Sequence, residues 1–173
     1  SQKFKARVSR LILEQKATII VDHISYNEIE GSYDSAIFTE EKHTSLDKAY
    51  QGRKSIVDYV FTDGTAKLSV ERKFVEDLDT STDVAVYAKL PKGFHIPTPV
   101  GNYSPDWAIA FKDGAVKHVY FVAETKGSMS TLDLRGIEDG KIACADRLFE
   151  QLSGSGIYYH KVTNYDDLME WVK

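Results

Sequence analysis

The sequence has little of what several classes of protein require. Cysteine occurs once, as Cys144, so no intramolecular disulfide can form. The five histidines are scattered, without a set of cysteine partners or a His-x-x-x-His pair, which argues against a zinc site. No stretch approaches the roughly 18 consecutive apolar residues of a membrane-spanning helix, and the N-terminus lacks the apolar core of a signal peptide. We therefore expect a cytoplasmic protein with no membrane partner.

An excess of positive charge is also absent. The 22 Lys and Arg residues stand against 26 Asp and Glu residues, which gives a formal net charge of -4. The basic stripe typical of many nucleic-acid-binding proteins is therefore missing. A nucleic-acid partner is not excluded, because carboxylates clustered at a metal site would themselves lower the net charge. A domain tethered to a DNA-binding neighbour also needs little electrostatic capture of its own.

What is present fits one globular domain of mixed α and β elements. The chain has 173 residues, of which 42% are hydrophobic, enough to bury a core. We expect N-terminal strands and a helix over residues 1–60 and the main core over 61–173, with no internal repeat. Because the chain begins with Ser1 rather than Met, we interpret it as a domain of a longer polypeptide.

Local patterns in the N-terminal half predict five segments. The β-branched run within 7–26 predicts one or two strands, and 45–59 predicts a helix with Ser45 as its N-cap. A second helix is expected near 68–79 because its apolar residues share one helical face. The segment 83–91 predicts a strand that ends at Pro91, and the proline-rich stretch 93–102 predicts a connector of turns.

The C-terminal half continues the mixed pattern. Two apolar runs, 107–111 and 119–123, flank Asp113 and Gly114, and an Asp-Gly pair between apolar runs is a strong hairpin signal. Apolar residues at spacings of three and four over 129–152 then predict a helix, broken near Gly140. A short strand, 156–162, and a terminal helix capped by Asn164 complete the chain.

The register of the hairpin decides whether its charged residues meet. A two-residue turn would set Asp106 opposite Phe121 and leave Glu124 on the other face of the sheet. A three-residue loop would set Asp106 opposite Val122, on the same face as Glu124 and Lys126. We favour the second register, with a bulge as the alternative, because it makes the other face wholly aromatic and aliphatic.

In the favoured register, the charged residues form a plausible metal site. The Cα atoms of Asp106 and Glu124 would lie roughly 7 to 8 Å apart, on the diagonal of the ladder. Two carboxylates this close repel unless one is protonated or a cation lies between them. Mg²⁺ suits the pair because it takes oxygen ligands from one or two carboxylates and keeps several waters. Lys126 would point the same way, where an ammonium can stabilise charge on a phosphate.

This arrangement resembles a known family. Pro105-Asp106, followed by Glu124-Thr125-Lys126, is similar to the PD-(D/E)XK nuclease signature. The wider stretch from Glu71 to Phe149 resembles the C-terminal endonuclease domain of the restriction subunit of type III restriction-modification enzymes. The resemblance implies a restriction-endonuclease-like fold, with a mixed central β-sheet flanked by helices. It also implies a type III site-specific deoxyribonuclease that hydrolyses phosphodiester bonds of double-stranded DNA.

The resemblance assigns roles to individual residues. Asp106 and Glu124 would bind Mg²⁺, or Mn²⁺ in its place, the backbone carbonyl of Thr125 would be a third ligand, and Lys126 would be the catalytic lysine. A glutamate of the preceding helix often adds to such sites, and Glu71 is the first choice. Its rival is Glu76, and the candidates for DNA contacts are Arg135, Lys141 and Tyr103. The implied partners are a helicase or translocase module of the same polypeptide, through which alone ATP would act, and a modification methyltransferase subunit.

Each assignment has a simpler alternative. Asp106 could merely begin a strand after a proline turn, and Glu124 and Lys126 could protect a sheet edge. Glu71 could be an exposed carboxylate that favours the helix dipole, and Arg135 or Lys141 could belong to a solvated helix face. The alternative function is a non-catalytic DNA-binding or docking module with the same fold. A two-carboxylate glycosidase is disfavoured because it needs no adjacent lysine.

Overall fold

The computed structural model describes residues 2–27, 29–39, 45–63, 69–112, 119–124 and 132–172. Within these ranges, no side chain is described for residues 17–18, 119–124, 132–135 and 153. The predicted turn at Asp113 and Gly114 lies outside the described residues, as do Thr125 and Lys126.

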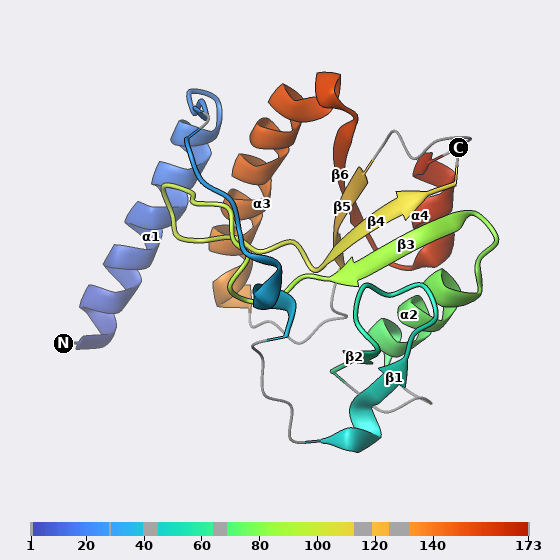
Figure 1. Ribbon diagram of the computed structural model, residues 1–173. Coiled ribbons are helices and arrows are strands. Elements are labelled where there is room, and N and C mark those ends of the chain that lie inside the picture. Colours follow the sequence, from blue (N-terminus) through green and yellow to red (C-terminus); the bar gives the residue numbers. More distant parts are fainter. Residues whose placement is uncertain are drawn as a thin grey trace.

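A four-stranded sheet, in the order β3–β4–β5–β6, lies between the helices at the centre of the fold (Figure 1). The strands β3 (Val84–Lys89), β4 (Trp107–Phe111) and β5 (Val119–Glu124) pair antiparallel. The last strand, β6 (Ile157–Val162), pairs parallel to β5. A parallel pair needs a long crossover connection, which α3 (Leu132–Leu152) supplies. The predicted mixture of helices and strands around a mixed sheet is therefore confirmed.

Two helices, α2 (Val70–Thr80) and α4 (Tyr165–Val172), pack on one face of the sheet. α2 begins where the Ser69 hydroxyl accepts a hydrogen bond from the Arg72 backbone N–H, at 3.2 Å. The core on this face joins the two helices to the strands through Phe74, Val75, Leu78, Val84, Tyr87, Trp107, Ile109, Phe111, Val162 and Leu168. Trp107 and Ile109 are fully buried here, so the start of β4 is held firmly in place.

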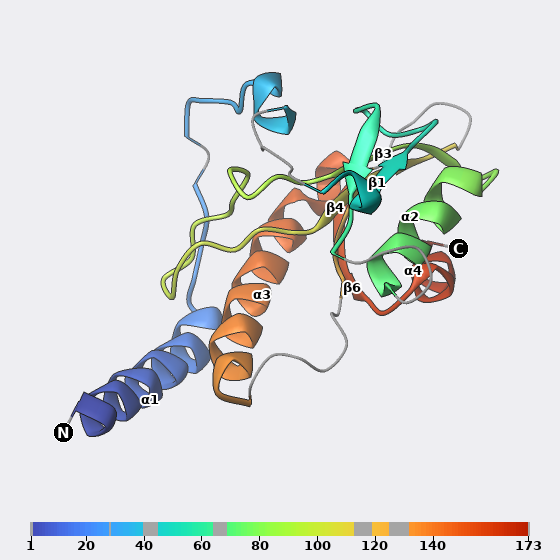
Figure 2. The same ribbon diagram turned by 90° about the horizontal axis from the view of Figure 1, so that it is seen from below.

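The other face of the sheet is covered by α3, and α1 (Gln2–Val21) lies against the far side of α3 (Figures 1 and 2). The core between α3 and the sheet contains Ile96, Tyr103, Ala145, Phe149 and Tyr159. The two outer helices approach closely at Gly136, where an added Cβ would lie 3.2 Å from the Glu14 side chain. Among the described residues, no helix is both long and apolar enough to cross a membrane.

Shorter elements complete the fold. β1 (Ala49–Gln51) and β2 (Tyr59–Phe61) form a separate antiparallel pair beside α2. Three 3₁₀ turns are η1 (Ser35–Phe38), η2 (Leu46–Lys48) and η3 (Ser153–Ser155).

The prediction for the first 60 residues is wrong in two places. Residues 7–26 were expected to form strands, but most of them belong to α1, because packing along α3 outweighs the β-branched run near its end. Residues 45–59 form η2, β1 and a turn rather than a helix. Gly52 explains the turn, since a Cβ there would lie 2.7 Å from the Tyr87 hydroxyl.

The predicted break near Gly140 is also wrong, because α3 continues through it. A glycine inside a helix costs only about 1 kcal/mol relative to alanine, and burial of the apolar face of α3 offsets this. The expected helix near 68–79, the strand before Pro91, the two hairpin strands and the last strand are confirmed. The Asn164 cap is confirmed as well, since its side-chain oxygen accepts from the Asp167 backbone N–H at 2.9 Å.

Candidate functional site

The end of β3, the start of β4 and the end of β5 lie side by side at one end of the sheet, across the strands. We call this end of the sheet the site edge. Lys89, the last residue of β3, pairs with Trp107, the first residue of β4. Trp107 in turn pairs with Val122, two residues before the end of β5 at Glu124. Asp106, which directly precedes β4, and Glu124 therefore lie at the same edge of the sheet, as the sequence predicted.

The predicted register between these strands is wrong. Trp107, not Asp106, lies opposite Val122, so neither of the two registers considered from the sequence occurs. A shift of one residue exchanges the faces of a strand, so the argument that set Asp106 and Glu124 on one face no longer holds. Opposite Val122, Trp107 is fully buried against the α2 side.

Asp106 is half-buried and anchored through its backbone. Its carbonyl oxygen accepts a hydrogen bond from the Leu90 backbone N–H, at 2.8 Å, which continues the β3–β4 ladder. Pro105 before it is fully buried. Burial, and to a smaller extent the charge of Asp106, raises the pKa of both Tyr103 and Tyr159. The proline turn and the ladder together hold Asp106 at the start of β4.

Tyr103 packs in the core and does not contact solvent as a DNA-binding residue would. It is 3% exposed, and its hydroxyl lies 2.6 Å from the Tyr159 hydroxyl. Burial first, and then the Tyr159 hydroxyl, raises the pKa of Tyr103 above its usual range. The predicted phosphate contact by Tyr103 is therefore wrong, because its only polar side-chain atom is buried and already bonded.

Glu71 reaches the site edge from the first turn of α2, and it is buried rather than exposed. The residue is 6% exposed, so the interpretation of Glu71 as a solvated helix-start carboxylate is wrong. Its Oε1 lies 2.7 Å from Lys89 Nζ, and its Oε2 accepts from the Asp63 backbone N–H at 2.5 Å. Lys89 Nζ also donates to the Phe61 carbonyl at 2.7 Å and lies 5.9 Å from the centre of the Trp107 ring. Lys89 is thus a residue of the site edge that the sequence did not single out.

Glu76, the rival of Glu71, forms an ion pair within its own helix. Its Oε1 lies 3.1 Å from Arg72 Nε, and its side chain is 43% exposed. Glu71 and not Glu76 is therefore the helix glutamate at the site edge. Lys89 lies inside the strand predicted over 83–91, but only the folded sheet places it beside Trp107.

The remaining predicted residues are only partly described. The side chains of Glu124 and Arg135 lie outside the described part of the structure. Lys141 Nζ lies 3.4 Å from Glu138 on the next turn of α3, and Lys141 is half-buried. Among the described side chains, no three His, Cys, Asp or Glu residues lie close enough to hold a metal ion. The described site edge thus presents Asp106 and the Glu71–Lys89 pair, and the other predicted metal ligands lie outside the described side chains.

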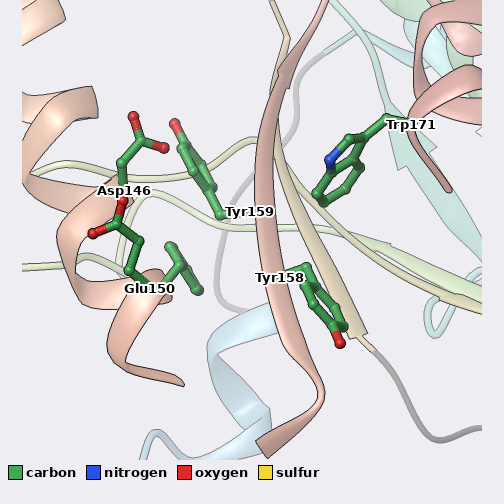
Figure 3. A pocket seen from close by; sticks show the side chains of 6 residues that line it. Asp146, Glu150, Tyr158, Tyr159 and Trp171 are labelled. Carbon is green, nitrogen blue, oxygen red and sulfur yellow. The ribbon is translucent and has the colours of Figure 1, made fainter. Parts of the chain in front are cut away.

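A hollow of about 300 Å³ lies beside the edge strand β6, away from the site edge. Asp146, Glu150 and Tyr159 line it on one side of the strand, and Tyr158 and Trp171 on the other (Figure 3). Burial, and next the charge of Glu150, raises the pKa of Asp146. Among the predicted site residues whose side chains are described, none lines this hollow.

Comparisons with known proteins match the region of the chain that contains the site edge. A family model described as an endonuclease domain matches residues 53–165, which include the whole site edge. The Res subunit of the type III restriction-modification enzyme EcoPI, from Escherichia phage P1, is 28% identical over 184 aligned positions. That of the EcoP15I enzyme, from Escherichia coli, is 29% identical over the same length. Both alignments cover 99% of this chain and 19% of the relative, so the chain spans about a fifth of the length of these relatives. No solved structure matches the chain significantly.

Proposed function

Because the chain belongs to the endonuclease-domain family, we propose that it hydrolyses phosphodiester bonds of double-stranded DNA as part of a type III restriction enzyme. The observation that carries the proposal is the pairing of β4 with β5 at the site edge, although its register differs from the one expected from the sequence. It brings the start of β4, with Asp106, and the end of β5, with Glu124, to one edge inside the matched region. We include in the proposal a restriction-endonuclease-like fold, since a mixed sheet between helices is consistent with it.

The donor atoms at the site edge fit Mg²⁺ or Mn²⁺, because carboxylate and carbonyl oxygens are the ligands that these hard cations prefer. Asp106, Glu124 and the Thr125 carbonyl would hold the ion, with Glu71 as a further ligand. When bound, such an ion supplies Lewis-acid polarisation of a phosphoryl oxygen and lowers the pKa of a bound water.

Basic side chains would stabilise the charge on the phosphate and hold the DNA. Lys126 would stabilise negative charge on the phosphate through its ammonium group. Arg135 and Lys141 of α3 would contact the DNA backbone, because phosphate contacts position a duplex without reading its sequence. Cleavage would therefore show little sequence preference of its own.

The rest of the proposal concerns partners. Since the chain spans about a fifth of Res subunits, we include a helicase or translocase module in the same polypeptide, a modification methyltransferase subunit and a cytoplasmic location. ATP would act only through the motor module. The site recognised in DNA would be read by the modification subunit, because a phosphate-contacting site carries no base readout.

The proposed activity can be tested by incubating supercoiled plasmid with the chain in different ions. We expect nicking and linearisation in Mg²⁺ and Mn²⁺, and none in EDTA. Ca²⁺ should support DNA binding without turnover, because its looser coordination orients the attacking water poorly. Agarose gels with matched ion concentrations give the readout.

Two outcomes would count against the nuclease. Full activity in EDTA would remove the metal from the mechanism. DNA binding without cleavage in any ion, both in this chain and in the intact polypeptide, would favour the non-catalytic DNA-binding module instead.

A further inference from the structure

Lys89 is the ion partner of Glu71 at the site edge, and nothing in the family signature assigns it a role. We propose that Lys89 is an exchangeable counter-ion that occupies Glu71 in the metal-free protein and competes there with the divalent cation. Lys89 would be a positioning residue, acting through Glu71. The proposal rests on the metal site of the proposed function, and its test separates the two.

The surroundings of Glu71 explain why it needs a counter-ion. The side chain is 7% exposed, and an unpaired carboxylate at that depth is strongly destabilising. Lys89 Nζ supplies the opposite charge at 2.7 Å, and the Asp63 backbone N–H binds the second carboxylate oxygen. The ion pair therefore places a cationic group at the position where Glu71 would receive Mg²⁺.

The side chains of Glu71 and Lys89 differ in how freely they can move out of the ion pair. Glu71 is fixed by the first turn of α2 and by its bond to Asp63. The Lys89 side chain is 28% exposed and has a flexible four-carbon stem, so its ammonium can turn toward solvent. Of the pair, Lys89 is the residue that can move when a divalent cation arrives.

Charge makes the exchange competitive. A carboxylate has lone pairs for more than one partner, but an ammonium group and a divalent cation on the same carboxylate repel each other. Binding of the metal must therefore displace Lys89 or be weakened by it. It follows that removal of the Lys89 charge should tighten metal binding, even though it removes a stabilising ion pair.

The test measures Mn²⁺ affinity directly, by titration calorimetry or by the spin resonance signal of free Mn²⁺. We expect Lys89→Met to bind Mn²⁺ on the order of 10-fold more tightly than the wild type. One strong charge interaction shifts the affinity of a carboxylate for a cation by about one pK unit, which is a factor of about 10. In the Glu71→Gln background, the same substitution should have no effect on affinity. Lys112→Met is the matched control, because Lys112 is exposed and follows the opposite end of β4.

Thermal melting gives a second readout, independent of cleavage. In EDTA, Lys89→Met should have a lower melting temperature than the wild type. Added Mn²⁺ should raise the melting temperature of the variant more than that of the wild type, because tighter binding stabilises the folded protein more. If the methionine variant fails to fold, Lys89→Gln serves in its place, since it removes the charge but can still donate to the Phe61 carbonyl.

Three outcomes separate the possibilities. Unchanged or weaker Mn²⁺ affinity in Lys89→Met, with metal-dependent cleavage intact in wild type, would overturn the competition alone. Equal tightening with and without Glu71 would also overturn it. No Mn²⁺ binding by any variant would overturn the metal site and the competition together.

Discussion

Asp106→Asn should abolish Mg²⁺-dependent DNA cleavage while leaving the fold intact. We expect a loss of about 10³-fold or more in rate, because a neutral amide is a poor ligand for Mg²⁺ and a bound metal supplies several kcal/mol of charge stabilisation. The backbone bond from Leu90 to the Asp106 carbonyl does not depend on the side chain, so the strand start should persist. Plasmid cleavage rates and melting curves, recorded on the same preparations, measure both effects.

Asp58→Asn provides the control for this substitution. Asp58 is exposed and precedes β2, and its exchange removes the same charge without touching the site edge. It should change neither cleavage nor melting temperature appreciably. Retention of normal cleavage by Asp106→Asn would show that Asp106 only begins a strand after the Pro105 turn, which is the simpler interpretation of the sequence.

The elements that the sequence predicted correctly are those whose signals are local. α2 has a serine cap and one apolar helical face, and β6 and α4 are separated by the Asn164 cap. The strands β3, β4 and β5 are short apolar runs bounded by turn-forming residues. In each case, the packing of the fold agrees with the intrinsic preference of the segment.

The elements that the sequence missed depend on distant contacts. α1 is helical although its last residues favour a strand, because it packs on α3, more than 100 positions later in the chain. The turn after β1 is held by α2 and β3 through Asp79 and Tyr87, and no local pattern reveals such partners. The prediction of the hairpin register failed as well, since the observed pairing of Trp107 with Val122 is one position away from the expected one and no local pattern fixes it.

The site was predictable only as a set of sequence positions. The family signature led to Asp106 and Glu124, and the pairing of β4 with β5 places them at one edge. The family signature did not reveal that Glu71 is buried and bound to Lys89. That ion pair joins α2 to the end of β3, so it forms only in the folded sheet. Composition gave no hint of the pair either, since an overall charge of -4 says nothing about single buried ions.

The largest effect on stability is expected at Asp79, the last acidic residue of α2. Asp79 is 6% exposed, and its Oδ1 accepts from the backbone N–H groups of Arg53 and Lys54, at 2.7 and 3.0 Å. The hydroxyl groups of Tyr87 and Tyr50 also donate to its carboxylate, at 3.1 and 3.2 Å. One carboxylate therefore ties α2 to β3 and to the turn after β1.

Asp79→Ala should lower the free energy of unfolding by about 3 to 5 kcal/mol, because it leaves several buried donors without an acceptor. Urea denaturation, followed by tryptophan fluorescence, measures the change. Asp77→Ala is the matched control on the same turn of α2. Burial raises the pKa of Asp77, so its charge does not favour folding, and its loss should cost little. A loss below about 1 kcal/mol in Asp79→Ala would contradict a structural role for these hydrogen bonds.

The pH dependence gives a stricter test of the same carboxylate. Burial opposes its ionisation, but the hydrogen bonds from Lys54, Arg53, Tyr87 and Tyr50 outweigh burial and lower the pKa of Asp79 in the folded protein. A lowered folded-state pKa stabilises the protein fully above the unfolded pKa, about 3.9 for aspartate, and this stabilisation is lost as the pH falls through the folded value. The stability difference between wild type and Asp79→Asn should therefore stay constant from neutral pH to about pH 5 and shrink only below about pH 4. A difference that already shrinks between pH 7 and pH 5 would mean that the folded-state pKa of Asp79 is raised, and that its four donors do not hold an ionised carboxylate.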